Sequence, residues 1–264
     1  MTKTSGKSKI KDFKRHEMFS KVKVPPGIPF FVRVDGKGFH RLISELKFAK
    51  PYDEKFMNIM VCSAKAVFEI GFNPVLAYIF SDEISFLFIK NFPYDGRIEK
   101  MDSLIPSAVA SAFTLKLVEE NYDHRIVLFD ARIIPVSHED IRMYLAWRQM
   151  EAWRNCMNAY AQMALEKMGY KGYKLAEKLK GMKAAEMHEL VFKELGINLA
   201  KVPTWQRRGI MIRWKKYEKV GYNPILKRYE TAWRRKIQVD WELPLFNTDK
   251  GKKYLEEVLA SFEV

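Results

Sequence analysis

The chain has 264 residues, 48% of them hydrophobic, and a formal net charge of +14 at pH 7. A chain of this length can bury one substantial core or two modest ones. No apolar run approaches the roughly 18 residues that a membrane span requires, and no apolar segment follows the lysine-rich N-terminus, so we expect a soluble, cytoplasmic protein without a membrane partner. Its two cysteines, Cys62 and Cys156, have no partners at metal-binding spacing, which predicts reduced thiols and no zinc site.

The first half of the chain alternates strand and helix patterns. We expect a strand at 28–35, a helix at 52–71, a hairpin at 75–89, a helix at 98–122 and a strand at 126–136. The order strand, helix, strand, strand, helix, strand is that of ferredoxin-like folds and polymerase palms. The predicted fold class is therefore α+β, an antiparallel sheet with helices covering one face.

The first predicted strand delivers a carboxylate into a glycine-rich turn. Strand alternation places Arg33 and Asp35 on one face and Val32 and Val34 on the other. In the turn from Gly36 to His40, the glycines allow positive φ and close approach, so backbone N–H groups can bind phosphate oxygens. The segment favours an anion site beside Asp35.

A second pair of acids, Asp82 and Glu83, lies at the tip of the predicted hairpin. Two magnesium ions that clamp a phosphoryl transfer need carboxylates from separate strands brought close together. Asp35 and Asp82 at neighbouring strand ends predict such a site. Each motif alone has an ordinary interpretation, because an Asp-Gly after a strand is usually a turn and acids at a hairpin tip are usually solvated; their combination favours the metals.

The second half of the chain is mainly helical and then strongly basic. We expect a long helix at 138–168, helical stretches at 173–181 and 184–195, a basic strand region, and a last helix at 249–262. We divide the chain into a palm-like catalytic core with the metal site, residues 1–136, and a long helix with a basic C-terminal region, residues 137–264. No long linker separates them, so we expect the second part to pack on the first.

Positive charge is concentrated between residues 201 and 236, which carry +10, and in residues 1–23, which carry +6. Arginine and lysine can follow phosphates while aromatic rings stack on unpaired bases. The alternative is a solvated surface whose aromatics form a strand core. We favour RNA contact, through Arg207, Arg208, Arg213, Arg234 and Arg235, with Trp205, Trp214, Tyr217, Tyr222, Tyr229 and Trp233 interleaved.

The acidic motifs and several other short segments resemble those of the tRNA-His guanylyltransferase family and its archaeal and bacterial relatives, the 3′–5′ nucleotide-adding enzymes. The match runs through residues 33–41, 48–51, 77–78, 81–83, 129–132, 144–149 and 208–209, in the family's order, over about residues 28 to 215. The resemblance implies Mg²⁺-dependent addition of GTP, and of other nucleoside triphosphates, to a tRNA 5′ end, with ATP able to activate that end. It also implies a homo-oligomer, a tetramer.

The resemblance implies roles at the metal site and along the phosphates. Asp35 and Asp82 would ligate both ions together with the Gly36 carbonyl oxygen, and Glu83 would orient the cluster or contribute a ligand. The triphosphate would bind along Lys37, Gly38, Phe39, His40 and Arg41. For His40, a packed histidine is an equally good interpretation.

It implies further roles around the base and the 5′ end. The guanine would contact Ala49, Tyr52 and Asp53, with Tyr52 in place of the family's usual asparagine. Activation of the 5′ end, or a second triphosphate, would involve Arg33, Lys50, Ser81, Arg132 and Asn155.

One departure from the family pattern bears on the substrate. The eukaryotic branch carries a His-Ile-Asn-Asn-Leu-Tyr-Asn-Thr signature, and the corresponding residues 153–160 keep only the first Asn, Asn155, and lack the His. This favours the archaeal-type branch, which adds nucleotides against a template base, over untemplated addition of a guanylate to tRNA-His.

Two rival classes stay open. A palm-type cyclase also places acids on a hairpin tip, but its Gly-Gly-Asp/Glu-Glu-Phe run is absent and it has no need of the basic region. A catalytically silent tRNA-binding protein would be expected to lack Asp35 or Asp82, and both are present.

Overall fold

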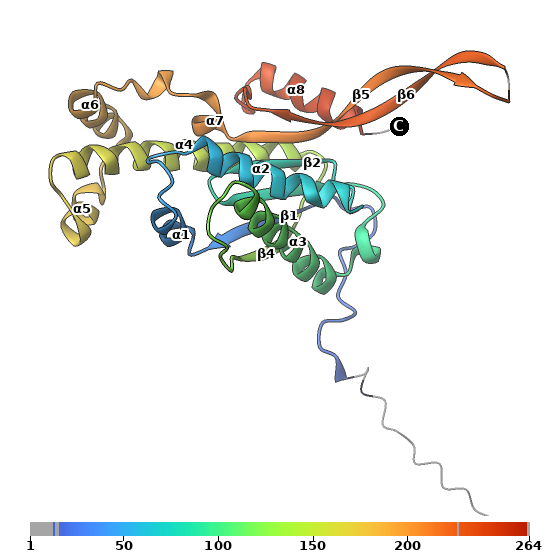
Figure 1. Ribbon diagram of the computed structural model, residues 1–264, viewed down its shortest axis with the longest axis horizontal. Coiled ribbons are helices and arrows are strands. Elements are labelled where there is room, and N and C mark those ends of the chain that lie inside the picture. The colour runs from blue at the N-terminus through green and yellow to red at the C-terminus, as the bar shows by residue number, and fades with distance from the viewer. Residues whose placement is uncertain (1–12, 14–15, 226, 263–264) are drawn as a thin grey trace, which may run out of the picture.

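The computed structural model describes residue 13, residues 16–225 and residues 227–262 (Figure 1). Its sheet has six strands in the order β4-β1-β3-β2-β5-β6, and every neighbouring pair is antiparallel. The first four positions are the order of a ferredoxin-like fold, which confirms the predicted fold class. The last two strands come from the C-terminal half.

The palm strands are β1 (Phe30–Lys37), β2 (Leu76–Phe80), β3 (Glu83–Phe88) and β4 (Leu128–Pro135). They lie close to the predicted ranges. Alternation along β1 divides the sheet into two faces, because Val32 and Val34 belong to one buried cluster while Phe31 packs in another. Arg33 and Asp35 share the face of Phe31 and so lie on the side away from the larger core.

Two long helices cover the first face. They are α2 (Glu54–Glu69), which begins at the capping residue Asp53, and α3 (Ile98–Glu119), preceded by η2 (Pro93–Gly96). Phe56, Met60 and Phe113 pack there against the strands. Burial of such large apolar side chains provides most of the stabilisation of the sheet.

One expectation about this helix layer was wrong. By length and composition alone α3 is long and apolar enough to cross a membrane, so an apolar run of that size does exist. The buried residues Met101, Ile105, Val109, Phe113 and Leu117 line one side of α3 and pack into the core. The apolar side chains of α3 therefore pack against α2 and the sheet.

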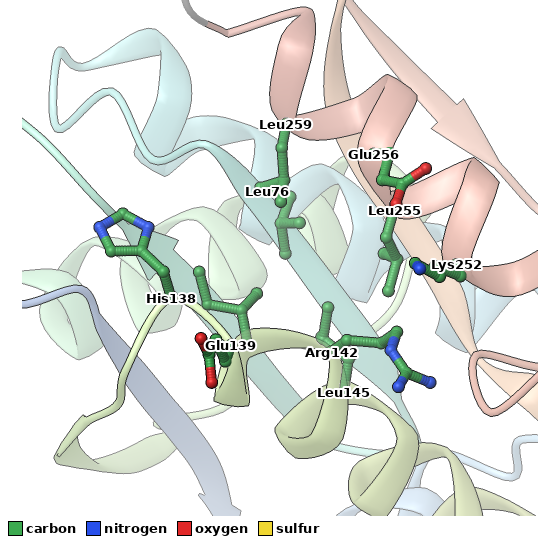
Figure 2. A pocket seen from close by; sticks show the side chains of 10 residues that line it. Leu76, His138, Glu139, Arg142, Leu145, Lys252, Leu255, Glu256 and Leu259 are labelled. Carbon is green, nitrogen blue, oxygen red and sulfur yellow. The ribbon is translucent and has the colours of Figure 1, made fainter.

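Helices also cover the second face, where we predicted helices on one face only. The long helix α4 (Asp140–Lys167) and the last helix α8 (Asp249–Ala260) pack there around Phe31, Leu76, Tyr78 and Met211. Between the start of α4 and α8 lies a groove over Leu76, with Leu145, Leu255 and Leu259 inside it and charged residues at its rim (Figure 2). Leu76 begins β2, so this groove lies at the opposite end of β2 from Asp82.

The rest of the second half consists of α5 (Gly172–Leu179), α6 (Ala184–Leu195), η3 (Leu199–Lys201), α7 (Thr204–Arg208), β5 (Ile210–Asn223) and β6 (Arg228–Asp240). Strand β5 pairs with β2 from Ile79↔Ile210 to Leu76↔Arg213. Beyond Arg213 it pairs with β6 alone, as a two-stranded ribbon that projects past the helices (Figure 1). At about 3.3 Å per residue, β5 runs on the order of 40 Å away from the catalytic end of β2.

Candidate active site

The predicted carboxylates lie together at one edge of the sheet. In the strand register Asp35 is opposite Glu83 of β3 on one side and Asp130 of β4 on the other. The Gly36 N–H donates to the Asp82 carbonyl oxygen at 3.1 Å, which ties the end of β1 to the β2–β3 turn. The strands thus bring Asp35 and Asp82 to neighbouring positions, as their spacing in the sequence predicts.

Burial acts on both carboxyls. It raises the pKa of Asp35, and the nearby Asp130 carboxylate raises it further, against the opposing effect of Arg132, Arg33 and Arg148. Burial likewise raises the pKa of Asp82, although the Ser81 hydroxyl donates to its Oδ1 at 2.9 Å. Carboxylates whose charge is unfavourable in the free protein are suited to a bound cation.

The donor set fits magnesium, which prefers carboxylate and carbonyl oxygens. Asp35, Asp82 and the backbone carbonyl of Gly36 are such donors. Within residues 13, 16–225 and 227–262, no three His, Cys, Asp or Glu side chains gather as a metal site. A Mg²⁺ ion at this edge would therefore have two carboxylates, a backbone oxygen and the phosphates of a substrate as its ligands.

Glu83 has a different environment from the two aspartates. Arg148 of α4 donates Nε to Oε1 at 2.9 Å and Nη2 to Oε2 at 2.8 Å. Burial raises the pKa of Glu83 to about 7, although the guanidinium opposes that shift. Both carboxylate oxygens of Glu83 are thus engaged by one arginine.

The glycine-rich turn is short and ends in a helix. Gly38, at φ 76°, is followed directly by the short helix α1 (Phe39–Glu45). Gly36 is required because a Cβ there would lie 2.4 Å from the Phe39 ring. The Phe39 side chain packs on Phe113 and Phe129 as a core residue, so its predicted phosphate contact would be made by the backbone N–H. The turn keeps Lys37 and Arg41 in one pocket with Arg125.

Arg41 and His40 lie on either side of this short helix. The Arg41 Nε donates to Glu45 Oε1 at 2.6 Å on the exposed surface. His40 is exposed and lines a pocket with Lys50 and Gln162 of α4. The structure therefore does not support the packed-histidine interpretation of His40.

The residues predicted around the guanine share a second pocket. Ala49, Tyr52, Asp53 and Ser81 line it together with core residues of α2. The Ala49 N–H donates to Asp53 Oδ2 at 2.7 Å, and Asp53 Oδ1 accepts from Lys55 N at 2.8 Å, so this carboxylate shapes the loop and caps α2. The Tyr52 ring also packs on Tyr160 and Trp205.

The remaining predicted residues lie along the second face of the sheet. Arg33 is opposite Arg132 of β4 in the register, and its guanidinium is 6.0 Å from the Trp147 ring. Arg132 lies 3.6 Å from Asp130. Asn155 is exposed on α4, two turns after Arg148 and on the same side of that helix.

The predicted RNA-contacting residues divide between a ribbon and the core. Arg213 donates to Asp240 Oδ2 at 2.5 Å, and both side chains are about 15% exposed, so its guanidinium has a partner within the protein and little surface for the predicted RNA contact. Trp205 packs on Trp241, and the Trp214 indole donates to the Pro74 carbonyl at 3.0 Å. Arg213, Trp205 and Trp214 therefore stabilise the fold, because neighbouring strands and helices enclose their side chains.

Arg207 and Arg208 end α7 rather than lying in a strand. The Arg207 Nε donates to the Val202 carbonyl at 2.9 Å, and the Arg208 Nη1 donates to that of Leu243 at 2.9 Å. Both line a pocket with Met150 and Trp153 of α4. Each guanidinium keeps further N–H groups beyond these bonds.

The ribbon has two chemically different faces, because residues opposite each other in a sheet share a face. One face, which we call the basic face, carries the cations Lys215, Lys219, Arg228, Arg234 and Lys236, with Tyr217 and Glu230. The other carries Val220, Tyr222, Tyr229 and Trp233, all exposed, with Arg235 and Lys216 near its base. Arg235 lies 5.0 Å from the Trp214 ring on that second face.

Sequence reasoning did not assign Arg148, Trp147 or Asp130 to the site. Arg148 and Trp147 lie within the matched segment 144–149, and Asp130 lies within 129–132, where only Arg132 was assigned a role. Their signal was the order of charged and aromatic residues in 129–132 and 144–149, but their partners on β3 and β1 are far away in the chain.

Comparisons with known proteins agree with this arrangement. Residues 8–137 match the family model of tRNAHis guanylyltransferase, and residues 139–244 that of the Thg1 C terminal domain. A tRNA(His) guanylyltransferase of Schizosaccharomyces pombe is 32% identical over 77% of this chain and 79% of its own. A probable tRNA(His) guanylyltransferase of mouse is 32% identical over 72% of this chain, which spans 65% of that relative's length.

Among solved structures, a bacterial tRNA(His) guanylyltransferase-like protein in complex with ATP superposes with a TM-score of 0.75 at 26% identity, covering 94% of this chain and 96% of that one. The two family models together extend through the acidic edge and both strands of the ribbon. With its palm sheet, paired aspartates and C-terminal strands, this chain belongs to the tRNA-His guanylyltransferase family.

Proposed function

We propose that this protein adds nucleotides to the 5′ end of tRNA in the 3′–5′ direction, with GTP and other nucleoside triphosphates as substrates. Asp35 and Asp82 carry the proposal, because the register and the Gly36–Asp82 hydrogen bond place them at one edge of the sheet. Family membership supports nucleotidyl transfer to tRNA. The ATP complex of the bacterial relative supports nucleotide binding at this fold.

Asp35, Asp82 and the Gly36 carbonyl would hold two Mg²⁺ ions, which neutralise phosphate charge and lower the barrier to attack. The 3′-hydroxyl of the incoming nucleotide attacks the activated 5′ phosphorus, and the bond to the leaving group breaks. With a 5′-triphosphate the leaving group is pyrophosphate; with a 5′-adenylate it is AMP. Most of the acceleration then comes from alignment and charge neutralisation.

The chain's other residues would bind and orient the two reactants. Lys37 and Arg41, which share a pocket with Arg125, would bind phosphate oxygens. The pocket of Ala49, Asp53 and Ser81 would hold the base. Arg33 and Arg132, opposite each other on β1 and β4, would hold the 5′ end or a second triphosphate together with Lys50 and Asn155.

The basic face of the ribbon would contact phosphates of the tRNA. Because β5 leads away from Asp82, these contacts would lie at a distance from the 5′ end that reacts. A cyclase has no use for such a surface, and a silent binding protein has no use for the buried aspartates.

Incubation with a 5′-truncated tRNA transcript, Mg²⁺ and each labelled nucleoside triphosphate separately tests the proposal. We expect a product lengthened at its 5′ end, and none from Asp82→Asn, which keeps the size of the side chain but removes its charge. A cyclic nucleotide formed without RNA would support the cyclase alternative. Binding of tRNA without elongation by any nucleotide would support the silent one.

A further inference from the structure

A buried ion pair connects the long helix α4 to the acidic edge of the sheet. The side chains of Glu83 and Arg148 are 11% and 9% exposed, and two parallel N–H···O bonds of 2.9 and 2.8 Å join them. Bidentate pairs of this kind fix orientation as well as distance. Glu83 follows Asp82 directly and lies opposite Asp35 in the register, so the pair borders both aspartates.

The Arg148 guanidinium is enclosed by rings. Its central carbon lies 4.3 Å from the Trp147 ring centroid and 5.3 Å from that of Phe80, the residue before the β2–β3 turn. A planar guanidinium can stack on such rings while its edge binds a carboxylate, and an ammonium group cannot do both. The surroundings are therefore specific for arginine rather than for positive charge alone.

Neighbouring contacts join α4 to β3, to β1 and to the segment before α8. The Tyr144 hydroxyl lies 3.0 Å from Ser85 Oγ of β3, one pleat beyond Glu83, and the Tyr144 ring stacks on Phe31 of β1 at 3.9 Å. Gln149 accepts from Phe246 N at 2.9 Å on the other side of α4. These contacts fix the position of α4, which carries Arg148. Arg148 in turn binds Glu83 at the start of β3, the strand that follows Asp82.

From this geometry we infer that Arg148 is a positioning residue for the nucleotidyl-transfer site, and that Glu83 is its partner rather than a metal ligand. Both Glu83 oxygens already accept a hydrogen bond from the desolvated guanidinium, and this orients the carboxylate toward α4 and leaves only its remaining lone pairs for an ion. The bidentate pair instead fixes the start of β3, and with it the direction in which the Asp82 carboxylate points toward Asp35. Asp35 and Asp82 remain the carboxylates available to the cation.

Only the expected effect on kcat rests on the proposed function. Two measurements distinguish a failure of this inference from a failure of the proposed function. One is the rate of nucleotide addition, with kcat and KM for GTP. The other is the rise in Tm of the full-length protein caused by Mg²⁺ with GTP, which reports binding without any turnover. If wild type shows no addition, the proposed function fails while the Tm titration still tests the role of Glu83.

The informative variants are Arg148→Lys and Glu83→Gln, each alone and together. We expect each single variant to lower kcat by about tenfold or more, since small displacements of reacting groups are costly, with KM for GTP and the Mg²⁺ concentration at half-maximal Tm shift changed by less than about threefold. The double variant should be no slower than the slower single variant, because the two residues act as one unit. Arg154→Lys, an exposed arginine on the same helix paired with Glu151, should match wild type.

Three results would overturn the inference. A tenfold or greater rise in the Mg²⁺ requirement of Glu83→Gln would make Glu83 a ligand. Wild-type kcat in Arg148→Lys would show that charge alone suffices. If the decrease in kcat of the double variant equals the product of the two single-variant decreases, the two residues act separately. If a single variant does not fold, Arg148→Met with Glu83→Leu, an apolar replacement of the whole pair, carries the same test of kcat against Mg²⁺ requirement.

Discussion

The acidic edge of the sheet and the β5–β6 ribbon use charge in opposite ways. At the edge, Glu83 is buried and Asp35 and Asp82 are half-buried, and burial raises the pKa of each. On the ribbon, cations such as Lys219 and Arg234 stand exposed along one face. Buried charges depend on specific partners, whereas exposed ones are screened and act roughly in proportion to their number. Substitutions should therefore have all-or-none effects at the edge and graded effects on the ribbon.

The largest expected effect is that of Asp35→Ala or Asp82→Ala. Each removes a carboxylate that both ions would share, so addition should fall by at least about a thousandfold. The folded state should persist, because burial makes these carboxylates unfavourable in the free protein. Nucleotide addition at ordinary Mg²⁺, with circular dichroism to check folding, measures both.

Asp130→Ala is the matched control for the two aspartates. Asp130 lies opposite Asp35 on β4, but its side chain is 57% exposed, so the variant should keep activity within about tenfold of wild type. Near-normal addition by Asp35→Ala or Asp82→Ala would place the metal site elsewhere.

A second prediction concerns selection of the nucleotide. Without the eukaryotic signature, residues 153–160 of α4 offer fewer groups to hold an unpaired nucleotide, so pairing with the opposite strand should supply the selectivity. We expect C opposite the vacant 5′ position to direct addition of G, and its change to A to direct U. Each nucleotide is supplied separately to the two transcripts.

The matched transcript with C serves as the control for that experiment. Efficient addition of G opposite A in a tRNA-His transcript, without addition of U, would mean that untemplated activity survives in this chain. The assignment to the archaeal-type branch would then be incorrect.

The junction between the sheet and the ribbon supplies a third prediction. Burial raises the pKa of Asp240, but hydrogen bonds from Arg213, Tyr254 and Gln238 outweigh it, and the resulting pKa lies below 3.8. Asp240→Asn leaves Arg213 buried and unpaired, which should cost about 3 kcal/mol of unfolding free energy at pH 7. Urea unfolding measures it, with the exposed Asp123→Asn as a control.

The pH dependence of that loss has a definite sign. Because the folded-state pKa of Asp240 is depressed, its stabilisation is present above the unfolded value and disappears as pH falls through the folded value. The difference in unfolding free energy between wild type and Asp240→Asn should therefore become smaller below about pH 4. A difference that stays constant from pH 7 to pH 3 would show that Asp240 acts through shape rather than charge.

Arg213 and Arg234 show what the sequence could and could not predict. Both are arginines in one basic segment, yet Arg213 meets Asp240 across the ladder while Arg234 meets Tyr217. Alternation along a strand predicts which residues share a face, and this was enough to bring Asp35 and Asp82 together. It does not predict the partner on another element, so Arg148, 65 residues from Glu83 in the chain, was missed.

The same limit explains Phe39 and Trp205. The glycine-rich turn before Phe, His and Arg favours an anion site, but it does not predict that Phe39 packs in the aromatic core between α2 and α3 and begins a helix. Trp205 resembles Trp233 in its basic surroundings, and only packing against Tyr52 and Trp241 distinguishes it. Large aromatic side chains follow whichever apolar surface the fold offers.

The smallest expected effect tests whether the ribbon binds RNA by one face. Arg234→Gln with Lys236→Gln removes two cations from the basic face, and Lys216→Gln with Arg235→Gln removes two from the other. We expect the first double variant to weaken tRNA binding by about tenfold at low salt and to reduce the salt slope by about 0.7 to 0.9 for each phosphate that the protein no longer neutralises. The second should stay within about twofold of wild type, because Arg235 is stacked between Trp214 and Phe262.

Fluorescence anisotropy of labelled tRNA across a salt series separates the outcomes. Equal losses would mean that the number of cations matters and their face does not, and no loss in either variant would restore the interpretation of the ribbon as a solvated surface.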